Sequence, residues 1–154
     1  MAGIDEKDEE ILRLLRKNGR MTLTEIGRRV GLSPASVKKR LEKLEGLGAI
    51  RGYSAVVDHS FLGRLVKILF LLRLKVEGPE IDKLVLRLAE RENVQSVYRI
   101  SGRAQIAIIA EFKDMKGMRS FAGSIKGIFG DTLEYIEWGV IYETPKECWV
   151  QWRG

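Results

Sequence analysis

Residues 22–48 read TLTEIGRRVGLSPASVKKRLEKLEGLG, and this stretch decides the fold of the first part of the chain. Apolar residues recur at helical spacing on both sides of a short break. In the break, Gly31 suits the left-handed residue that ends a helix, and Ser33 can accept a hydrogen bond from the first free amides of the next helix. Pro34 fits the first position of that next helix. So short a connection predicts a helix-turn-helix.

The second helix of this pair has an apolar side and a polar, basic side. Val37, Leu41 and Leu44 share the apolar side when each residue is turned by about 100° from the last. The polar side begins with small residues, which let a helix approach base edges, and continues with cations, which can contact guanine or phosphate. The residues predicted to contact DNA, from this helix and the segment after it, are Ser33, Pro34, Ala35, Ser36, Lys38, Lys39, Arg40, Lys43 and Arg51. The alternative is an ordinary solvated helix surface.

Positive charge is concentrated around this stretch. Residues 1–10 hold one Lys and five acidic residues, whereas residues 13–51 hold eleven Lys or Arg and three Glu, a net charge of +8. The whole chain carries only +6. A local excess of this kind is typical of nucleic-acid binding, so we expect double-stranded DNA as the partner. About four phosphate contacts per subunit predict a log–log salt slope of about −7 for a dimer.

The composition excludes several other classes of protein. A chain of 154 residues with 45% hydrophobic residues can bury one core or two small ones. The single cysteine, Cys148, excludes an internal disulfide framework, and the only histidine, His59, has no neighbour at metal-ligand spacing. We therefore expect no metal and no cofactor. Residues 61–74 are too short and too charged to span a bilayer, and the acidic N-terminus is unlike a secretory signal. We expect a cytoplasmic, nucleoid-associated protein without membrane contact.

The first domain is predicted to be a winged helix. Its three helices are expected over residues 5–18, 22–30 and 34–47. Asp5 is the expected first N-cap, and residues 49–58, rich in strand formers, are the expected wing or connecting strand. The predicted organisation is residues 1–50 for the winged helix-turn-helix, 51–64 for the connecting strand and linker, and 65–154 for a second domain.

In the second domain, strands and amphipathic helices alternate. The predicted elements are strand 66–76, helix 81–92, strand 94–100, strand 104–112, a helix capped by Asp114, and strand 131–142. This βαββαβ order is ferredoxin-like, with both helices on one sheet face, and makes the fold class α+β. Alternating apolar residues predict that a second copy covers the other face, in a homodimer: Phe70, Leu72, Tyr98, Ile106 and Ile108.

Three segments carry a family resemblance. They read IDEKDEEILRLLRKNGR at 4–20, GLSPASVKKRLEKLEGLGAIRGY at 31–53 and VYRISGRAQIAIIAEF at 97–112. Together they closely resemble the leucine-responsive and asparagine-operon regulators, the Lrp/AsnC family, over nearly the whole chain. The resemblance implies a homodimer built through a C-terminal ligand-sensing domain, assembly into tetramers or octamers, and winged helices bound to pseudo-palindromic DNA.

The resemblance also implies an amino-acid effector near the loop between the second and third strands of the sensing domain. The matching positions here are Ser101, Gly102, Arg103 and Gln105, with Glu134 nearby. The family places acidic residues after the glycine, in a Gly-Asp-x-Asp arrangement, whereas this chain has Arg103 and Gln105. An acid can pair with an ammonium group, but Arg103 repels one and suits a carboxylate. Either the effector differs from that of the family, or the domain only oligomerises.

The tail ETPKECWVQWRG is unusually aromatic, with Trp149 and Trp152. It is predicted to be an added strand that covers a sheet edge or forms a dimer contact, and a mobile tail is the alternative.

Three functions fit this sequence to different degrees. A sequence-specific transcriptional regulator accounts for the resemblance and the basic helix surface. An architectural DNA-compacting protein would use the same domain without a consensus site. Siroheme decarboxylase subunits are similar to the family, but their chemistry involves histidines in the sensing domain, and His59 precedes that domain. Because no paired-carboxylate, nucleophile or phosphate-loop pattern is present, we expect no enzymatic activity.

Overall fold

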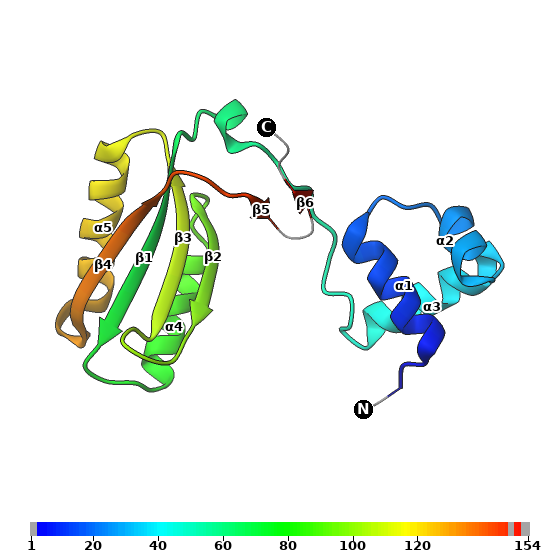
Figure 1. The fold of residues 1–154 in the computed structure, drawn as a ribbon. Helices are drawn as coiled ribbons and strands as arrows, with labels where there is room; N and C mark the ends of the chain where they lie inside the picture. The colour runs from blue at the N-terminus through cyan, green and yellow to red at the C-terminus, as the bar shows by residue number, and fades with distance from the viewer. Residues whose placement is uncertain (1–2, 148–149, 152–154) are drawn as a thin grey trace. The chain divides into compact units, whose positions relative to one another are not determined.

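The computed structural model describes residues 3–147 and 150–151. Two compact units make up the chain (Figure 1). The first runs to Val57 and includes the residues from Pro145 onward, and the second runs from Asp58 to Thr144.

Three helices form the core of the first unit: α1 (Glu6–Lys17), α2 (Leu23–Val30) and α3 (Pro34–Gly46). Each lies within about two residues of its predicted range, because local chemistry fixes the ends. Asp5, Thr22 and Ser33 each accept a hydrogen bond from a backbone amide in the first turn of their helix, and Gly31 ends α2 at φ 71°. The helices enclose one apolar cluster of buried residues, Ile11, Ile26, Val30, Val37 and Leu44.

The strand predicted over residues 49–58 is wrong. Residues 51–58 form no strand, and the apolar side chains of Tyr53, Val56 and Val57 are exposed. A strand needs a neighbour for its backbone N–H and C=O groups, and this segment has no strand partner in the described part of the chain. The hydroxyl of Tyr53 instead donates to Glu45 at 2.8 Å, which ties the segment to the end of α3.

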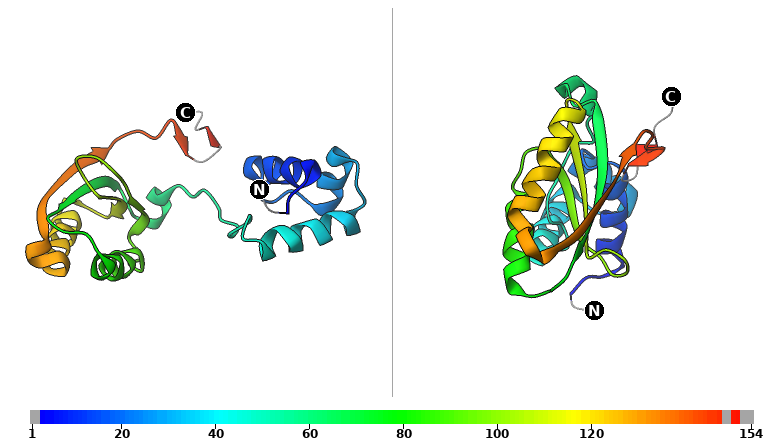
Figure 2. Two further views of the ribbon diagram at one scale, coloured as in Figure 1. Left: turned by 90° about the horizontal axis from the view of Figure 1, so that it is seen from below. Right: turned by 90° about the vertical axis from the view of Figure 1, so that its left-hand side faces the viewer.

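The second unit begins with a short 3-10 helix, η1 (His59–Leu62), and then follows the predicted βαββαβ order. Its elements are β1 (Val66–Leu74), α4 (Pro79–Ala89), β2 (Val94–Arg99), β3 (Ile106–Phe112), α5 (Met115–Phe129), the one-turn 3-10 helix η2 (Gly130–Thr132) and β4 (Leu133–Ile141). The strands form an antiparallel sheet in the order β2-β3-β1-β4. Both long helices cover the same face of this sheet (Figure 2), so the predicted ferredoxin-like fold is confirmed.

The prediction of which sheet face is open was mostly wrong. Phe70, Leu72, Ile106 and Ile108 are fully buried in the core beneath the helices, and only Tyr98 lies on the opposite face. The sequence held the signal for the correct phase, because Lys67 and Arg73 share the phase of Leu69 and Leu71, whereas every residue in the phase of Phe70 is apolar.

The open face nevertheless has an apolar centre. Leu69 and Leu71 of β1 are half-buried there, and they pair across the sheet with Ile109 and Ala107. None of the described helices covers these side chains.

The tail does not extend this sheet. Its described strands, β5 (Lys146–Glu147) and β6 (Val150–Gln151), pair with each other in a separate two-stranded sheet. The predicted coverage of a sheet edge is therefore not seen for the described strands, and a dimer contact by the tail stays a prediction. Cys148, Trp149 and Trp152 lie outside the described residues.

Candidate nucleic-acid interface

The first turn of α3 is built from small, mutually bonded residues. The Oγ of Ser33 accepts from the backbone N–H of Ser36 at 3.1 Å, and the two serine hydroxyls lie 2.9 Å apart. Pro34 occupies the opening position of the helix, where no N–H is needed. Ser33, Pro34 and Ala35 are exposed. The helix therefore presents an end without bulky side chains, which a base edge could approach.

The turn before α3 depends on a glycine that the sequence patterns did not single out. A Cβ atom on Gly27 would lie only 2.3 Å from the backbone oxygen of Leu32. The N–H of Leu32 also donates to the carbonyl of Gly27 at 2.9 Å. Because the close neighbour is backbone, this approach sets how tightly the turn folds back over α2.

Two cations of α3 are available on its outward surface. Lys38 and Lys39 are both exposed. Lys38 lies 3.9 Å from Glu42, which is a weak surface pair, and no described residue forms an ion pair with Lys39. Arg51, just beyond the helix, is also exposed and has no ion-pair partner within the described ranges.

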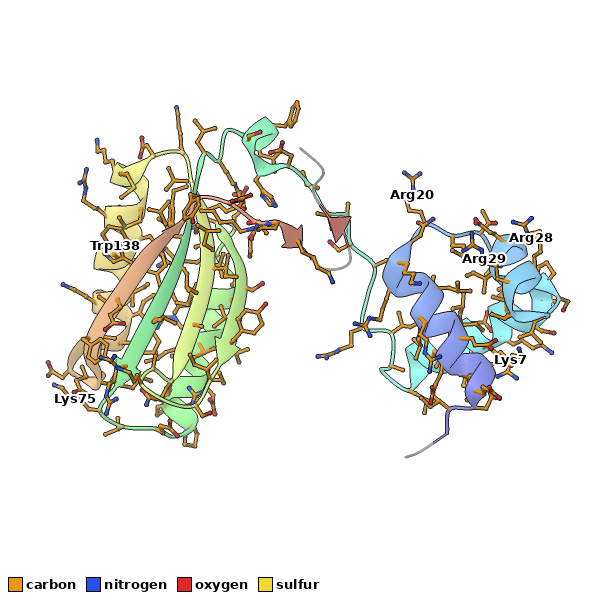
Figure 3. The ribbon with its side chains drawn as sticks, viewed as in Figure 1. Lys7, Arg20, Arg28, Arg29, Lys75 and Trp138 are labelled. Carbon is orange, nitrogen blue, oxygen red and sulfur yellow. The ribbon has the colours of Figure 1, made fainter. Side chains whose placement is uncertain are left out.

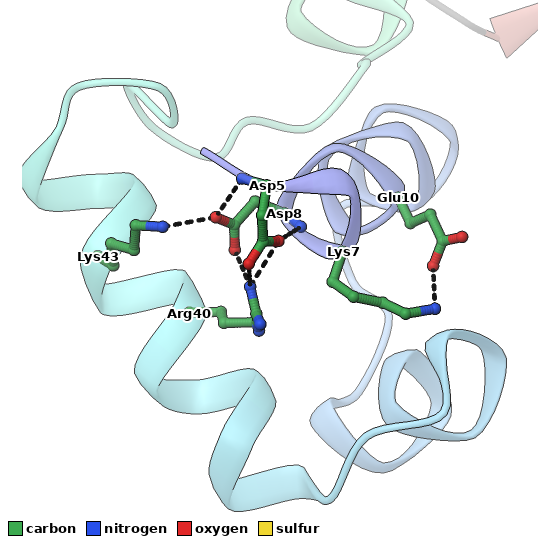
Figure 4. A network of polar contacts seen from close by, with 6 residues as sticks. All are labelled: Asp5, Lys7, Asp8, Glu10, Arg40 and Lys43. Carbon is green, nitrogen blue, oxygen red and sulfur yellow. Dashed lines mark hydrogen bonds and ion pairs between the residues drawn. The ribbon is translucent and has the colours of Figure 1, made fainter. Parts of the chain in front are cut away.

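The other two predicted cations of α3 are held by acids of α1 (Figure 4). An Nη1 atom of Arg40 donates to both carboxylate oxygens of Asp5 and to Oδ1 of Asp8, each at 2.7 Å. The ammonium of Lys43 donates to Oδ2 of Asp8 at 2.6 Å. Arg40 and Lys43 are therefore already paired in the folded chain, and their contacts with DNA stay a prediction.

Asp8 is the centre of this network. Its side chain has no exposed surface, and it also closes a capping box, because Oδ2 of Asp8 accepts from the N–H of Asp5 at 3.1 Å. Burial by itself raises the pKa of Asp8, but the hydrogen bonds from Lys43 and Arg40 outweigh burial and lower the pKa to about 2. The carboxylate is thus ionised at neutral pH and balances two cations.

A second group of cations was missed by the sequence analysis. Arg20, Arg28 and Arg29 project from α2 and the connection before it (Figure 3). Arg29 pairs with Glu25 at 2.9 Å, but Arg28 is exposed and has no ion-pair partner among the residues that the structure describes. The first helix of a helix-turn-helix crosses the DNA backbone, so basic residues at the end of that helix were the signal that could have identified this group.

Two of the predicted effector residues, Arg103 and Glu134, are linked in the structure through Arg73. The carbonyl of Arg103 accepts from Arg73 at 3.1 Å and from the hydroxyl of Tyr135 at 3.2 Å. Arg73 also pairs with Glu134 at 3.0 Å, and this carboxylate raises the pKa of Arg73. Gln105 uses its side-chain oxygen to accept from the N–H of Leu74, so it supports the end of β1.

The remaining predicted effector positions, Ser101 and Gly102, lie in the exposed loop that joins β2 and β3. Gly102 has a φ of 116°, a backbone conformation that few other residues adopt.

His59 belongs to a polar cluster on the open sheet face. Its Nδ1 lies 2.5 Å from Oε2 of the buried Glu111. The side-chain nitrogen of Gln95 donates to Oε1 of Glu111 at 2.5 Å and lies 2.9 Å from the histidine Nε2. Sequence spacing gave no sign of this contact, because His59 and Glu111 are far apart in the chain.

Across residues 3–147 and 150–151, no three His, Cys, Asp or Glu side chains lie close enough together to hold a metal ion. No helix in the same ranges is long and apolar enough to cross a membrane.

A three-helix unit with a capped, partly basic third helix, followed by a ferredoxin-like unit, defines a helix-turn-helix DNA-binding protein with a separate α+β domain. Residues 4–45 match the AsnC-type helix-turn-helix domain, and residues 69–132 match the Lrp/AsnC ligand binding domain.

Similar proteins agree with this class. A relative from Pyrococcus furiosus, named as an HTH-type transcriptional regulator, is 48% identical over 96% of both chains. Another from Pyrococcus abyssi, with the same designation, is 42% identical over 97% of this chain and 98% of its own. The feast or famine regulatory protein of M. tuberculosis, solved in complex with L-methionine, has a TM-score of 0.83 at 25% identity, over 94% of this chain and 96% of that one. The chain belongs to the Lrp/AsnC family of DNA-binding transcriptional regulators.

Proposed function

We propose that this regulator binds pseudo-palindromic DNA as a homodimer, with one α3 helix in each of two successive major grooves. The observation that carries the proposal is the outward surface of α3, where Ala35 and the exposed Lys38 and Lys39 follow a small, capped first turn. Two helices related by a dimer axis would meet half-sites about one helical turn apart. Ser33, Ser36, Ala35 and Lys39 are the proposed base-edge contacts, with Pro34 opening the helix beside them.

The phosphate contacts that we propose differ from those expected from sequence. Arg40 and Lys43 are occupied by acids and Lys39 is assigned to a base edge, which leaves Lys38 and Arg51 of the original five cations. Two contacts per subunit give about four per dimer, and a log–log salt slope of about −4 in place of −7. A contact from Arg28 would steepen that slope again.

Selection of bound sequences from random duplexes tests this function. A specific regulator yields a consensus with two half-sites, whereas an architectural DNA-compacting protein yields none. If Lys39 reads a base, Lys39→Ala should cost about 1–3 kcal/mol and relax the preference at one position. A uniform loss on every duplex would assign Lys39 to the phosphate backbone. A tetrapyrrole absorbance band in the purified protein would instead support the siroheme decarboxylase-like alternative.

The homodimer is proposed to form through the open face of the second unit. Leu71 lies near the centre of this face, paired with Ala107 on one side and Glu137 on the other. Leu71→Glu should therefore yield a monomer by analytical ultracentrifugation. Leu86→Glu is the matched control, because Leu86 is already exposed on α4. A dimer that survives Leu71→Glu would assign the interface elsewhere, and larger species would indicate tetramers or octamers.

A small effector is the remaining part of the proposal. The similar protein from M. tuberculosis was solved with L-methionine. In this chain the loop between β2 and β3 offers Ser101, Gly102 and Arg103. Glu134 is already paired with Arg73, so an ammonium group would have to displace that pair. We propose that Arg103 binds a carboxylate. Calorimetry with L-methionine and with the matching 2-oxo acid tests this idea: the oxo acid should bind at least as well, and Arg103→Gln should abolish binding. No heat with either ligand would favour a domain that only oligomerises.

A further inference from the structure

We infer that Asp8, supported by Asp5, is a specificity-determining residue: it withholds Arg40 and Lys43 from the DNA backbone and fixes the rotation of the recognition helix. This inference rests on the proposed sequence-specific binding by α3. It assigns a role to the acidic start of the chain, which by its charge alone would only weaken DNA binding.

The contacts show how firmly the cations are held. Asp8 is fully buried and joins α1 to α3, with one carboxylate oxygen on Arg40 and the other on Lys43. Asp5 adds two further contacts to Arg40. Charge-assisted hydrogen bonds of 2.6 to 2.7 Å are the strong kind. If either cation turned to a phosphate, the buried Asp8 would lose one of its two cationic partners, which is costly.

The positions of these cations explain why their release would matter. At about 100° per residue, Lys39 lies about 20° from the centre of the outward surface of α3, and Lys43 lies about 60° from it. Arg40 lies about 120° away, on the flank that meets α1. Lys43 keeps 42% of its side-chain surface exposed, so its flexible stem would reach the backbone beside the groove if Asp8 released it.

Phosphate contacts add affinity for every sequence alike. Because non-specific binding is almost entirely the sum of such contacts, each additional free cation raises binding to wrong sites. An acid that occupies two cations of the recognition helix therefore lowers the affinity for the operator and for wrong sites by the same factor, so a change in their ratio has to come from the base-reading residues. The bonds of Asp8 join α1 to α3 at two positions of α3, Arg40 and Lys43. They therefore hold the base-reading residues of α3 at one rotation relative to the other two helices.

The decisive comparison is Asp8→Asn against Glu9→Gln. Both remove one negative charge from α1, but the only described residue with which Glu9 pairs is the exposed Arg13. Dissociation constants are measured on the selected operator and on a scrambled duplex, over a series of salt concentrations. We expect Asp8→Asn to tighten scrambled-duplex binding several-fold and to lower the ratio of specific to non-specific affinity about tenfold. Its salt slope should steepen by about 2, for one released Lys43 in each subunit. Glu9→Gln should shift both duplexes equally.

A substitution of Lys43 tests the inference even if the Asp8→Asn variant does not fold. Lys43→Gln in the otherwise unchanged protein should leave the salt slope as it is, since Lys43 makes no phosphate contact. In the Asp8→Asn background, the same substitution should restore the original slope. A slope that becomes shallower by about 2 on Lys43→Gln alone would overturn the inference. The inference would also be overturned if Asp8→Asn changed DNA binding in the same way as Glu9→Gln. The same holds if Asp8→Asn weakened the affinity for the operator and for the scrambled duplex by the same factor. If the unchanged protein does not distinguish the two duplexes, the proposed function itself fails, which is a separate result.

Discussion

Protonation of Asp8 should measurably loosen the first unit. The pKa of this carboxyl falls from 3.8 to about 2 on folding, because the bonds from Lys43 and Arg40 outweigh its burial. One pKa unit corresponds to about 1.36 kcal/mol, so the ionised form of Asp8 stabilises the folded unit by about 2 kcal/mol.

The sign of the effect follows from the direction of the pKa change. A carboxyl whose pKa is lowered by folding contributes its full stabilisation above the unfolded value, and loses it as the pH falls through the folded value. For Asp8 the loss should occur between about pH 4 and pH 2. Asp5 has a lowered pKa for a related reason, a hydrogen bond from Arg40, so the unchanged protein and an Asp8→Asn variant will share part of the acid response. Their difference isolates Asp8.

Hydrogen exchange read by mass spectrometry is the suitable assay. It reads α1 to α3 directly, whereas Trp138, on β4, reports on the second unit. Peptides from these helices give the opening free energy of the first unit alone. Comparing both proteins at each pH removes the intrinsic exchange rates from the difference.

The expected gap is about 2 kcal/mol at neutral pH, with Asp8→Asn less stable, and it should close almost completely by pH 2. A gap that stays constant down to pH 2 would show that Asp8 acts by shape rather than by charge. Equal stability at neutral pH would refute the reasoning outright, because an ionised buried carboxylate with two cationic partners would then contribute nothing.

Three further outcomes follow from the structure. Gly27→Val should destabilise the first unit by about 2 kcal/mol in a thermal melt followed by circular dichroism, because backbone blocks the Cβ, whereas Gly123→Val on the open surface of α5 should cost less than half of that. Arg28→Gln should make the salt slope of DNA binding shallower by about 2 per dimer if α2 contacts phosphate, and an unchanged slope would remove it from the interface. Glu111→Ala should destabilise the second unit by about 1–3 kcal/mol, measured by exchange of the β3 amides, because it leaves the side-chain amide of Gln95 without its acceptor.

Local chemistry explains why the helices of the first unit were predictable. Asp5, Ser33 and Gly31 act on the backbone within a few residues of themselves, so their identities and positions carry the structural information. The same reasoning placed all four strands of the second unit, since each apolar run is bounded by a break such as Gly78-Pro79.

Partners distant in the chain were not predictable in the same way. The inward phase of β1 is an exception, because Lys67 and Arg73 mark the open phase and Phe70 could have been assigned to the core from sequence. A strand-forming composition at 49–58 does not supply a neighbouring strand. Arg40 and Asp8 lie 32 residues apart, and only the packing of α1 on α3 shows that they meet.

This last contact changes what the charge of the chain means. A net charge of +8 over residues 13–51 predicts a strongly basic DNA-binding surface only if its cations are independent of the acids that precede them. In the folded unit the cations of α3 are not independent of these acids. Asp5 and Asp8 of α1 pair with cations on one flank of α3, whereas Lys38 and Lys39 remain exposed. The acidic start of α1 therefore determines, through its ion pairs, which cations of α3 remain available to DNA.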